Sequence, residues 1–324
     1  MKVNPRLRRL FSFLLVAAAF AFLGRQILGD FDAVRGFDWR LRPAMLLLSL
    51  VALVLVLMAG FGYWAILLRS FGLRPPLVPL ARTWFLANLS RYIPGMVWQF
   101  VSLAQFGGAA GLRPVVSITS LLVQMGFMVL SAAALGVLLL PGSALGDAYP
   151  LLRDIRWAAP AALIAVHPIV IRTLVRWMGR LSRKATLDWQ GSWRTGLALL
   201  LLAAALWTAG GASFYLFLRS FVDLPLQLLP TVIAINAVAF LAGSLAFFAP
   251  AGLGFKEAAL TLLLAGMMPT PVAASLAVIA RLWSIVGELL PALVLLPGGF
   301  RRGDRSAVEE LPDHSPTAPD GGPR

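Results

Sequence analysis

The stretch from Pro43 to Leu68 contains no charged residue and, as a helix, is long enough to cross a lipid bilayer. Similar apolar stretches recur along the chain of 324 residues, of which 59% are hydrophobic and 13% are charged. Because a soluble domain carries about 25% charged residues, this composition is typical of a polytopic membrane protein. The sequence therefore predicts an all-α integral membrane fold.

The cations of the chain are mostly found beside its apolar segments. The net charge of +14 would favour nucleic-acid binding in a soluble chain, but cations in these positions orient a membrane protein. We therefore expect no nucleic-acid partner. The absence of cysteine excludes disulfides and thiolate metal sites, and no pattern in the sequence indicates a cofactor or a metal.

Two of the apolar segments are interrupted by proline and glycine. The first interruption lies between Asn88 and Trp98, and the second lies between Phe247 and Glu257. Proline removes a backbone donor, and glycine adopts conformations that other residues avoid. In lipid, the freed backbone groups must bond within the protein or face a water-filled cavity. Each interruption thus separates two shorter helices, which we expect at 77–92 and 96–110, and at 227–248 and 255–265.

Each interrupted segment could cross the membrane as a broken helix or return to its own side as a re-entrant hairpin. Charge favours the hairpin, because only then do the cations at 172–194 lie on the same side as the N-terminal cations, as the positive-inside tendency requires. This arrangement predicts about six transmembrane helices plus two re-entrant helical hairpins. It places both termini in the cytoplasm and the chain in the cytoplasmic (inner) membrane of a bacterium. The six spans are expected at 10–28, 43–68, 114–140, 155–175, 197–218 and 272–296.

A weak internal repeat supports the same arrangement. Residues 68–75 match residues 218–225 at five of eight positions, with an offset of 219 − 69 = 150. With three crossings before the second copy, that copy is inverted relative to the first, which is a transporter pattern; chance similarity among apolar helices is the alternative. The tail, rich in Pro, Gly, Asp and Glu, is expected to be disordered and cytoplasmic. The predicted organisation is one membrane domain at 1–300, with repeats at about 43–142 and 193–298, a linker helix at about 155–178, and the tail at 301–324.

A helix that starts at the end of a hairpin presents unpaired N–H groups and the positive end of its dipole, which attract anions. The two hairpins would bring such helix ends to the middle of the membrane, where Arg91 and Lys256 add cations. A guanidinium group can bind phosphate through two hydrogen bonds. The predicted substrate-binding residues are Arg91, Tyr92, Pro94, Gly95, Gly252, Gly254, Lys256, Glu257, Arg281 and Glu288.

Several of these charged side chains also have simpler interpretations. Arg91 could reach the membrane interface instead of lining a cavity. Arg281 and Glu288, seven residues apart on one helix face, could form an ion pair that serves packing. Alternatively, Arg281 could complete a cationic pocket that Glu288 balances. Glu257 could cap the dipole of its helix or take part in coupling.

The two interruptions carry the signatures Arg91-Tyr92-Ile93-Pro94-Gly95-x-x-Trp98 and Pro250-x-Gly252-x-Gly254-x-x-Glu257. With these signatures, residues 7–300 resemble the lysylphosphatidylglycerol synthase transmembrane region family, also called flippase-like. Fused members of that family move an aminoacylated phospholipid between leaflets and carry a separate cytoplasmic synthase domain, which this sequence does not show. Many relatives have Lys at the position of Met96, so this sequence lacks that cation. The resemblance implies a lipid flippase.

Three functions are compatible with this pattern. The first is a lipid flippase or transporter, which binds a phospholipid or another anionic or zwitterionic lipid and moves it between leaflets. The second is a lipid-binding partner of an envelope complex that transports nothing. The third is an intramembrane transferase that uses Glu257 and Glu288. We do not expect an enzyme, because the sequence has no nucleophile elbow and no metal-spaced set of ligands.

Overall fold

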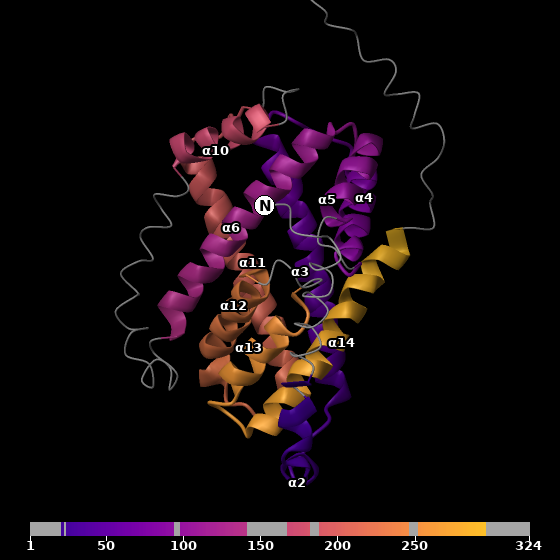
Figure 1. Ribbon diagram of the computed structural model, residues 1–324, viewed down its shortest axis with the longest axis vertical. Coiled ribbons are helices and arrows are strands. Elements are labelled where there is room, and N and C mark those ends of the chain that lie inside the picture. Colours follow the sequence, from indigo (N-terminus) through magenta and orange to yellow (C-terminus); the bar gives the residue numbers. More distant parts are fainter. Residues whose placement is uncertain are drawn as a thin grey trace, which may run out of the picture.

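A computed structural model of the chain describes residues 21–22, 24–93, 98–140, 167–181, 188–245 and 252–295. All regular structure in these ranges is helical (Figure 1). The helices are α2 (Phe31–Arg35), α3 (Pro43–Arg69), α4 (Leu77–Ser90), α5 (Trp98–Phe106), η1 (Gly107–Ala110), α6 (Pro114–Leu139), α10 (Pro168–Leu181), α11 (Trp193–Arg219), η4 (Leu226–Leu228), α12 (Leu229–Leu245), α13 (Phe255–Leu264) and α14 (Thr270–Leu295).

Five helices in the described ranges are long and apolar enough to span a membrane, with mean hydropathies between 1.8 and 2.8. They are α3, α6, α11, the continuous stretch Leu226–Leu245, and α14. Four of the five match predicted spans. The fifth, formed by η4 and α12, corresponds to the helix predicted at 227–248 as one arm of the second hairpin, and it is itself long enough to span a membrane. The chain is therefore a helical membrane protein.

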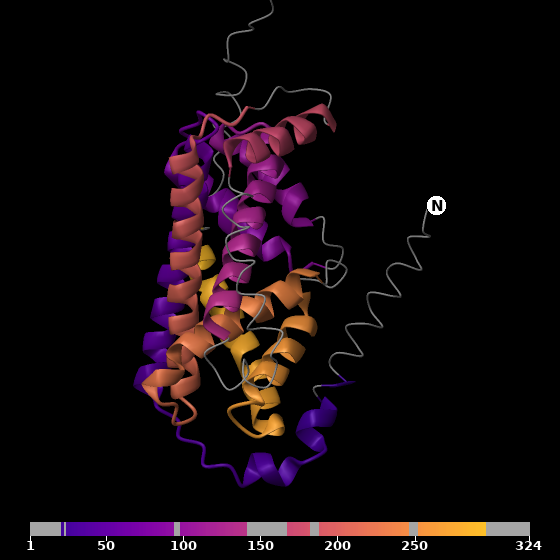
Figure 2. The same ribbon diagram turned by 90° about the vertical axis from the view of Figure 1, so that its left-hand side faces the viewer.

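Some sequence predictions fall on residues outside the described ranges. These residues include most of the first predicted span, Pro94 and Gly95, and the tail at 301–324. The predicted linker helix lies only partly within the described residues. There, α10 begins at Pro168 as a separate helix of 14 residues, too short to span, so residues 168–178 do not continue a membrane-spanning helix. Both views place α10 across one end of the bundle (Figures 1 and 2).

Helices α3 and α11, the longest in the described part of the chain, run antiparallel and are joined at both ends. The N–H of Arg42, just before α3, donates to the carbonyl of Ser220 at the end of α11 (2.8 Å). The N–H of Gln190, just before α11, donates to the carbonyl of Ser70 at the end of α3 (2.9 Å). Each helix has 27 residues, and their bounds differ by 150 at both ends (193 − 43 and 219 − 69), which is the offset of the sequence repeat.

Helices α4 and α5 form a helical hairpin near the α10 end of the molecule (Figure 1). Two hydrogen bonds between side chains and neighbouring groups join its two arms. The hydroxyl of Ser102 donates to the hydroxyl of Ser90 (2.7 Å), and the hydroxyl of Thr83 donates to the carbonyl of Phe106 (3.0 Å). Near the turn, the amide nitrogen of Gln99 donates to the amide oxygen of Asn88 (3.3 Å), so these two side chains also link the helices. Helices α12 and α13 lie in the opposite half of the molecule.

Small residues allow the long helices to pack closely, as is common in membranes, where lipid supplies no hydrophobic drive for association. At Gly211 on α11, an added Cβ would lie 2.6 Å from the Cα of Ile233 on α12. The backbones of α11 and α12 therefore approach each other at a point where only glycine fits.

This close approach gives a prediction about stability. We expect Gly211→Ala to lower the free energy of unfolding by about 1–3 kcal/mol, because the two helices must separate to admit the methyl group. Thermal unfolding in detergent micelles measures the effect. The adjacent Gly210→Ala is the matched control, since its Cβ would meet its nearest neighbour at 3.7 Å. Equal melting temperatures for the two variants would contradict the packing described.

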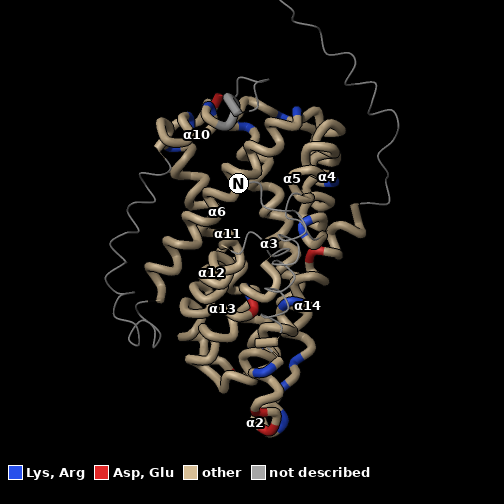
Figure 3. Tube along the Cα trace, viewed as in Figure 1, with Lys and Arg blue, Asp and Glu red and all other residues tan. Residues whose placement is uncertain are grey.

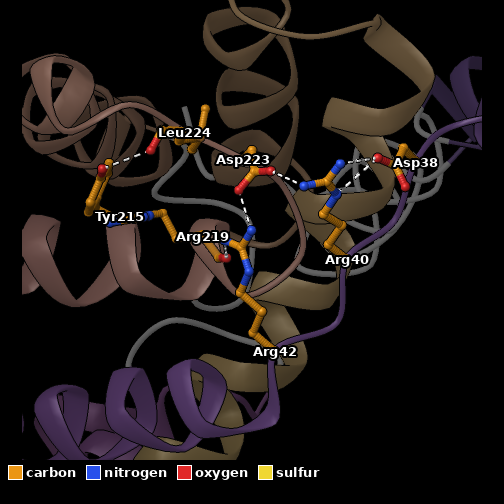
Figure 4. A network of polar contacts seen from close by, with 7 residues as sticks. All are labelled: Asp38, Arg40, Arg42, Tyr215, Arg219, Asp223 and Leu224. Carbon is orange, nitrogen blue, oxygen red and sulfur yellow. Dashed lines mark hydrogen bonds and ion pairs between the residues drawn. The ribbon is translucent and has the colours of Figure 1, made fainter.

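Charged residues gather at the two ends of the bundle, and a few lie between the ends (Figure 3). Lys and Arg gather at the α10 end, and acidic residues accompany arginines at the α2 end. At the α2 end, Asp223, in the loop after α11, accepts hydrogen bonds from Arg42 and from Arg40 (2.7 Å) (Figure 4). Arg40 also pairs with Asp38 (2.9 Å). These exposed ion pairs fasten the segment before α3 to the end of α11.

The hydrogen bond from Arg42, together with the charges of Arg42 and Arg40, lowers the pKa of the Asp223 carboxyl. A lowered pKa in the folded state means that the carboxylate contributes stability above its unfolded pKa of about 4. That contribution is lost as the pH falls through the lower, folded-state pKa.

We therefore expect the wild-type melting temperature to fall on acidification below about pH 4, and Asp223→Asn to weaken that dependence. The effect is small, because the group is exposed and the pair is screened by solvent. Melting temperatures of both proteins between pH 3 and 7 measure it. An identical acid profile in the variant would show that Asp223 contributes nothing.

Candidate functional site

Arg91 forms an ion pair with Glu288, which joins the hairpin of α4 and α5 to α14. Arg91 is the residue directly after α4, and Glu288 lies within α14. The hydroxyl of Tyr92 donates to the second carboxylate oxygen of Glu288 at 3.0 Å. The Glu288 side chain is 11% exposed, so both of its oxygens are held by protein groups in a nearly buried place.

A second ion pair joins α13 to α14. The Nη1 atom of Arg281 lies 3.3 Å from the Oε1 atom of Glu257. The Oε2 atom of Glu257 accepts a hydrogen bond from the N–H of Gly254 at 2.7 Å, and so caps the start of α13. Gly254 has φ +85°, a conformation that favours glycine. The cap and the ion pair thus use the two oxygens of one carboxylate that is 3% exposed.

Tyr92 connects the two ion pairs. The guanidinium carbons of Arg91 and Arg281 lie 5.6 Å and 5.1 Å from the centroid of its ring, within the range of cation–π attraction. A continuous polar chain therefore runs from Gly254 through Glu257, Arg281, Tyr92 and Glu288 to Arg91. We call this set, together with Lys256, the ionic cluster. It brings together residues of α4, α13 and α14 that are far apart in the sequence.

The ionic cluster carries excess positive charge. It contains three cations (Arg91, Lys256 and Arg281) and two carboxylates (Glu257 and Glu288), which gives 3 − 2 = +1 with all groups ionised. Among the described residues, Lys256 makes no ion pair. Such an excess inside an apolar bundle favours an anion nearby.

A small cavity of about 20 Å³ adjoins the ionic cluster. Three charged residues of the ionic cluster line it, namely Lys256, Glu257 and Arg281. The other lining residues are Phe214 of α11, Asn236 of α12, Leu260 of α13, and Ala277, Ala280, Trp283 and Ser284 of α14. A polar cavity of this size holds about one water molecule. A phospholipid headgroup is much larger, so the site is closed around the cluster in this structure.

Glycines shape the chain where it approaches α13. Gly252 has φ +66°, and an added Cβ there would lie 2.9 Å from the carbonyl oxygen of Gly243 at the end of α12. An added Cβ at Gly243 would lie 3.2 Å from the Cβ of Lys256. The glycines therefore let the end of α12 approach the start of α13, so that the backbone of Gly243 lies close to Lys256.

The structure shows where the side chains lie for which the sequence left alternatives open. Arg281 and Glu288 share a helix, but each forms its ion pair with a residue outside α14, namely Glu257 and Arg91, and not with the other. Glu257 caps its helix, and its carboxylate occupies the place predicted for an external anion. Arg91 turns to Glu288 within the bundle and is 35% exposed. Pro94 and Gly95 lie outside the described residues.

Sequence reasoning missed some residues around the ionic cluster. It did not place Phe214, Asn236, Trp283 or Ser284 at the site, although all four line the cavity. Ser284 stands three residues after Arg281 on the same helix, and this spacing could have indicated that they share a face. Among the described residues, no three His, Cys, Asp or Glu side chains lie close enough together to hold a metal ion.

A comparison of the sequence with models of known protein families found no match, and a comparison with curated proteins found none either.

Proposed function

We propose that this chain is a lipid flippase or transporter that moves a phospholipid, or another lipid with an anionic or zwitterionic headgroup, between the leaflets of the cytoplasmic membrane of a bacterium. The α10 end, with its many arginines, faces the cytoplasm under the positive-inside tendency. Both termini lie on that side. The ionic cluster is the place where the headgroup is bound during transfer.

Two features of the fold support this proposal. The first is the pair of hairpins, α4 with α5 and α12 with α13, which lie in opposite halves of the bundle (Figure 1). We interpret them as re-entrant hairpins that enter from opposite leaflets. The second is the pairing of equal helices: α3 and α11 have 27 residues each, and α6 and α14 have 26 each. Because α3 and α11 run antiparallel, the two halves fit an inverted repeat, the architecture of many transporters.

The observation that carries the proposal is the ionic cluster itself. A charge at the centre of a bilayer costs at least about 2.5–3.5 kcal/mol, so charged residues there generally mark a pathway or a site. Here they join the turn of one hairpin to the turn of the other through α14, with an excess charge of +1. A site at the contact between two repeats is where alternating access places the substrate.

The chemistry of transfer follows from the ion pairs. A phosphate group near Arg91 competes with Glu288 for the guanidinium, which can bind it through two hydrogen bonds. Lys256 supplies the charge that the two carboxylates leave unbalanced. Because the cavity of about 20 Å³ cannot hold a headgroup, binding must be accompanied by separation of the hairpins, and the pair between Arg91 and Glu288 is the one that opens.

A leaflet-transfer assay tests this proposal. The purified protein is reconstituted in vesicles with a fluorescent phosphatidylglycerol, and dithionite measures how much label reaches the outer leaflet. We expect faster transfer with the protein than in protein-free vesicles, both without a gradient and with a proton gradient or membrane potential. Transfer no faster than in protein-free vesicles under every gradient would contradict the proposal.

The small cavity favours one second candidate, a lipid-binding partner that transports nothing. A site too small for a headgroup can also belong to a protein whose ionic cluster only holds the helices together. This candidate predicts lipid that copurifies with the chain but does not change leaflet in the same assay.

A further inference from the structure

A second polar cavity, of about 340 Å³, lies apart from the ionic cluster, where α3 ends and α4 begins. Two arginines and four apolar residues line it: Ala65, Arg69, Arg74, Pro75, Leu77 and Leu80. Arg69 is the last residue of α3, at the end of the bundle that carries most of the cations (Figure 3). No carboxylate lines this cavity.

Both arginines are exposed, and within the described part of the chain neither guanidinium takes part in an ion pair. The start of α4 adds further positive potential, since Pro76 gives that helix no side-chain cap. The backbone N–H groups of Leu77 and Val78 therefore have no intrahelical acceptor. Two guanidinium groups and an uncapped helix start thus border one cavity, a combination that binds anions.

The corresponding turn of the second repeat already contains an anion. There, the sequence Leu218–Pro225 matches Leu68–Pro75, and Asp223 forms ion pairs with Arg40 and Arg42 close to Arg219 (Figure 4). The position equivalent to Asp223 in the first repeat is Leu73 (223 − 150 = 73). The turn at one end of the bundle thus carries a carboxylate that pairs with nearby arginines, whereas the turn at the other end has none and its two arginines line an open cavity.

The geometry points to a phosphate-binding site in this cavity, with the phosphodiester of a membrane lipid as the ligand. The cavity is large enough for a phosphate with a small polar headgroup. The acyl chains would then lie along exposed apolar side chains next to it, at Ile66 (44% exposed), Leu77 (57%) and Val78 (57%). This arrangement gives the headgroup polar partners and leaves the chains in the bilayer. The inference uses the membrane placement of the proposed function but does not require transport.

Lipid binding to the full-length protein tests the site. Native mass spectrometry in a detergent measures how many phosphatidylglycerol molecules bind, with phosphatidylcholine and inorganic phosphate as separate probes. The test variant is Arg69→Gln/Arg74→Gln. The control, Arg113→Gln/Arg194→Gln, removes the same charge from exposed arginines that do not line the cavity. Elution as a single species in size-exclusion chromatography checks that each variant folds.

We expect the test variant to bind phosphatidylglycerol at least tenfold more weakly than the wild type and the control variant, because two charge-assisted contacts are lost. Weaker binding of both lipids, with inorganic phosphate unbound, supports a lipid phosphodiester as the ligand. Binding of inorganic phosphate alone that depends on Arg69 and Arg74 assigns the site to free phosphate instead. An equal loss in test and control variants, or no loss in either, overturns the site.

The leaflet-transfer assay separates this inference from the proposed function. If the wild type moves lipid and the test variant binds lipid normally, the site is refuted and the transporter stands. If the wild type moves no lipid but its binding depends on Arg69 and Arg74, the site stands and the transporter is refuted.

Discussion

Glu257→Ala is expected to lower the free energy of unfolding by about 3–5 kcal/mol, a large effect for a single substitution. The substitution removes a carboxylate that is 3% exposed, and with it the ion pair to Arg281 and the cap at the N–H of Gly254. It leaves a cation in the bundle without this counter-charge, which is why the loss exceeds the value of an ordinary hydrogen bond. Thermal unfolding in detergent micelles, combined with denaturant titration, measures the change.

The exposed pair of Arg176 and Asp188 is the matched control, since both side chains are more than half exposed. Asp188→Ala should change stability by less than about 1 kcal/mol, because solvent screens such a pair. The Glu257→Gln variant separates the two roles of the carboxylate, since the amide oxygen can still cap the helix without balancing Arg281. If Glu257→Ala and Asp188→Ala melt at the same temperature, the buried pair does not stabilise the bundle.

Exchanging the charges of Arg91 and Glu288 is expected to separate the structural role of this ion pair from its role in transfer. Arg91→Glu places two carboxylates together, and Glu288→Arg places two guanidinium groups together, so each variant should melt at a lower temperature and move lipid more than tenfold more slowly. The double exchange restores the ion pair and with it the melting temperature. It does not restore transfer, because the cation no longer lies at the turn of the hairpin, where a headgroup would meet it.

Melting temperatures and the leaflet-transfer assay on the same preparations give both readouts. Tyr92→Phe is the control, because it removes only the 3.0 Å hydrogen bond to Glu288 and should cost about 1 kcal/mol of stability. If the double exchange restores transfer together with stability, the pair serves packing alone, and the headgroup must bind elsewhere.

The helices could be predicted because their signals are local. An uncharged run such as Pro43–Leu68 has few alternatives to a membrane helix, and α3 indeed covers Pro43–Arg69. Proline marks the first residue of α3 and of α6, at Pro43 and Pro114, where its fixed φ suits a helix start. The break after Arg91 likewise follows from local chemistry, since α4 ends at Ser90.

The partners within the site could not be predicted in the same way. The spacing of Arg281 and Glu288 shows only that they share a face of α14, and long side chains on one face can reach different neighbours. Their actual partners, Glu257 and Arg91, are set by how α13 and α4 pack against α14. Similarly, the apolar run at 155–175 suggested one spanning helix, but Pro168 starts a new helix with arginines at 172, 176 and 180, and such an amphipathic helix suits a membrane interface.

The most direct test of the account is to find which side of the membrane the ends of each hairpin face. The chain has no cysteine, so single cysteines can be introduced without background. Pro76→Cys and Arg113→Cys flank the hairpin of α4 and α5, and Leu226→Cys and Pro269→Cys flank the hairpin of α12 and α13. In intact cells and inverted vesicles, an impermeant maleimide should label the first two from the cytoplasmic side and the last two from the opposite side. Labelling of Pro76→Cys and Arg113→Cys from different sides would mean that the broken segment crosses the membrane, and would contradict two hairpins entering from opposite leaflets.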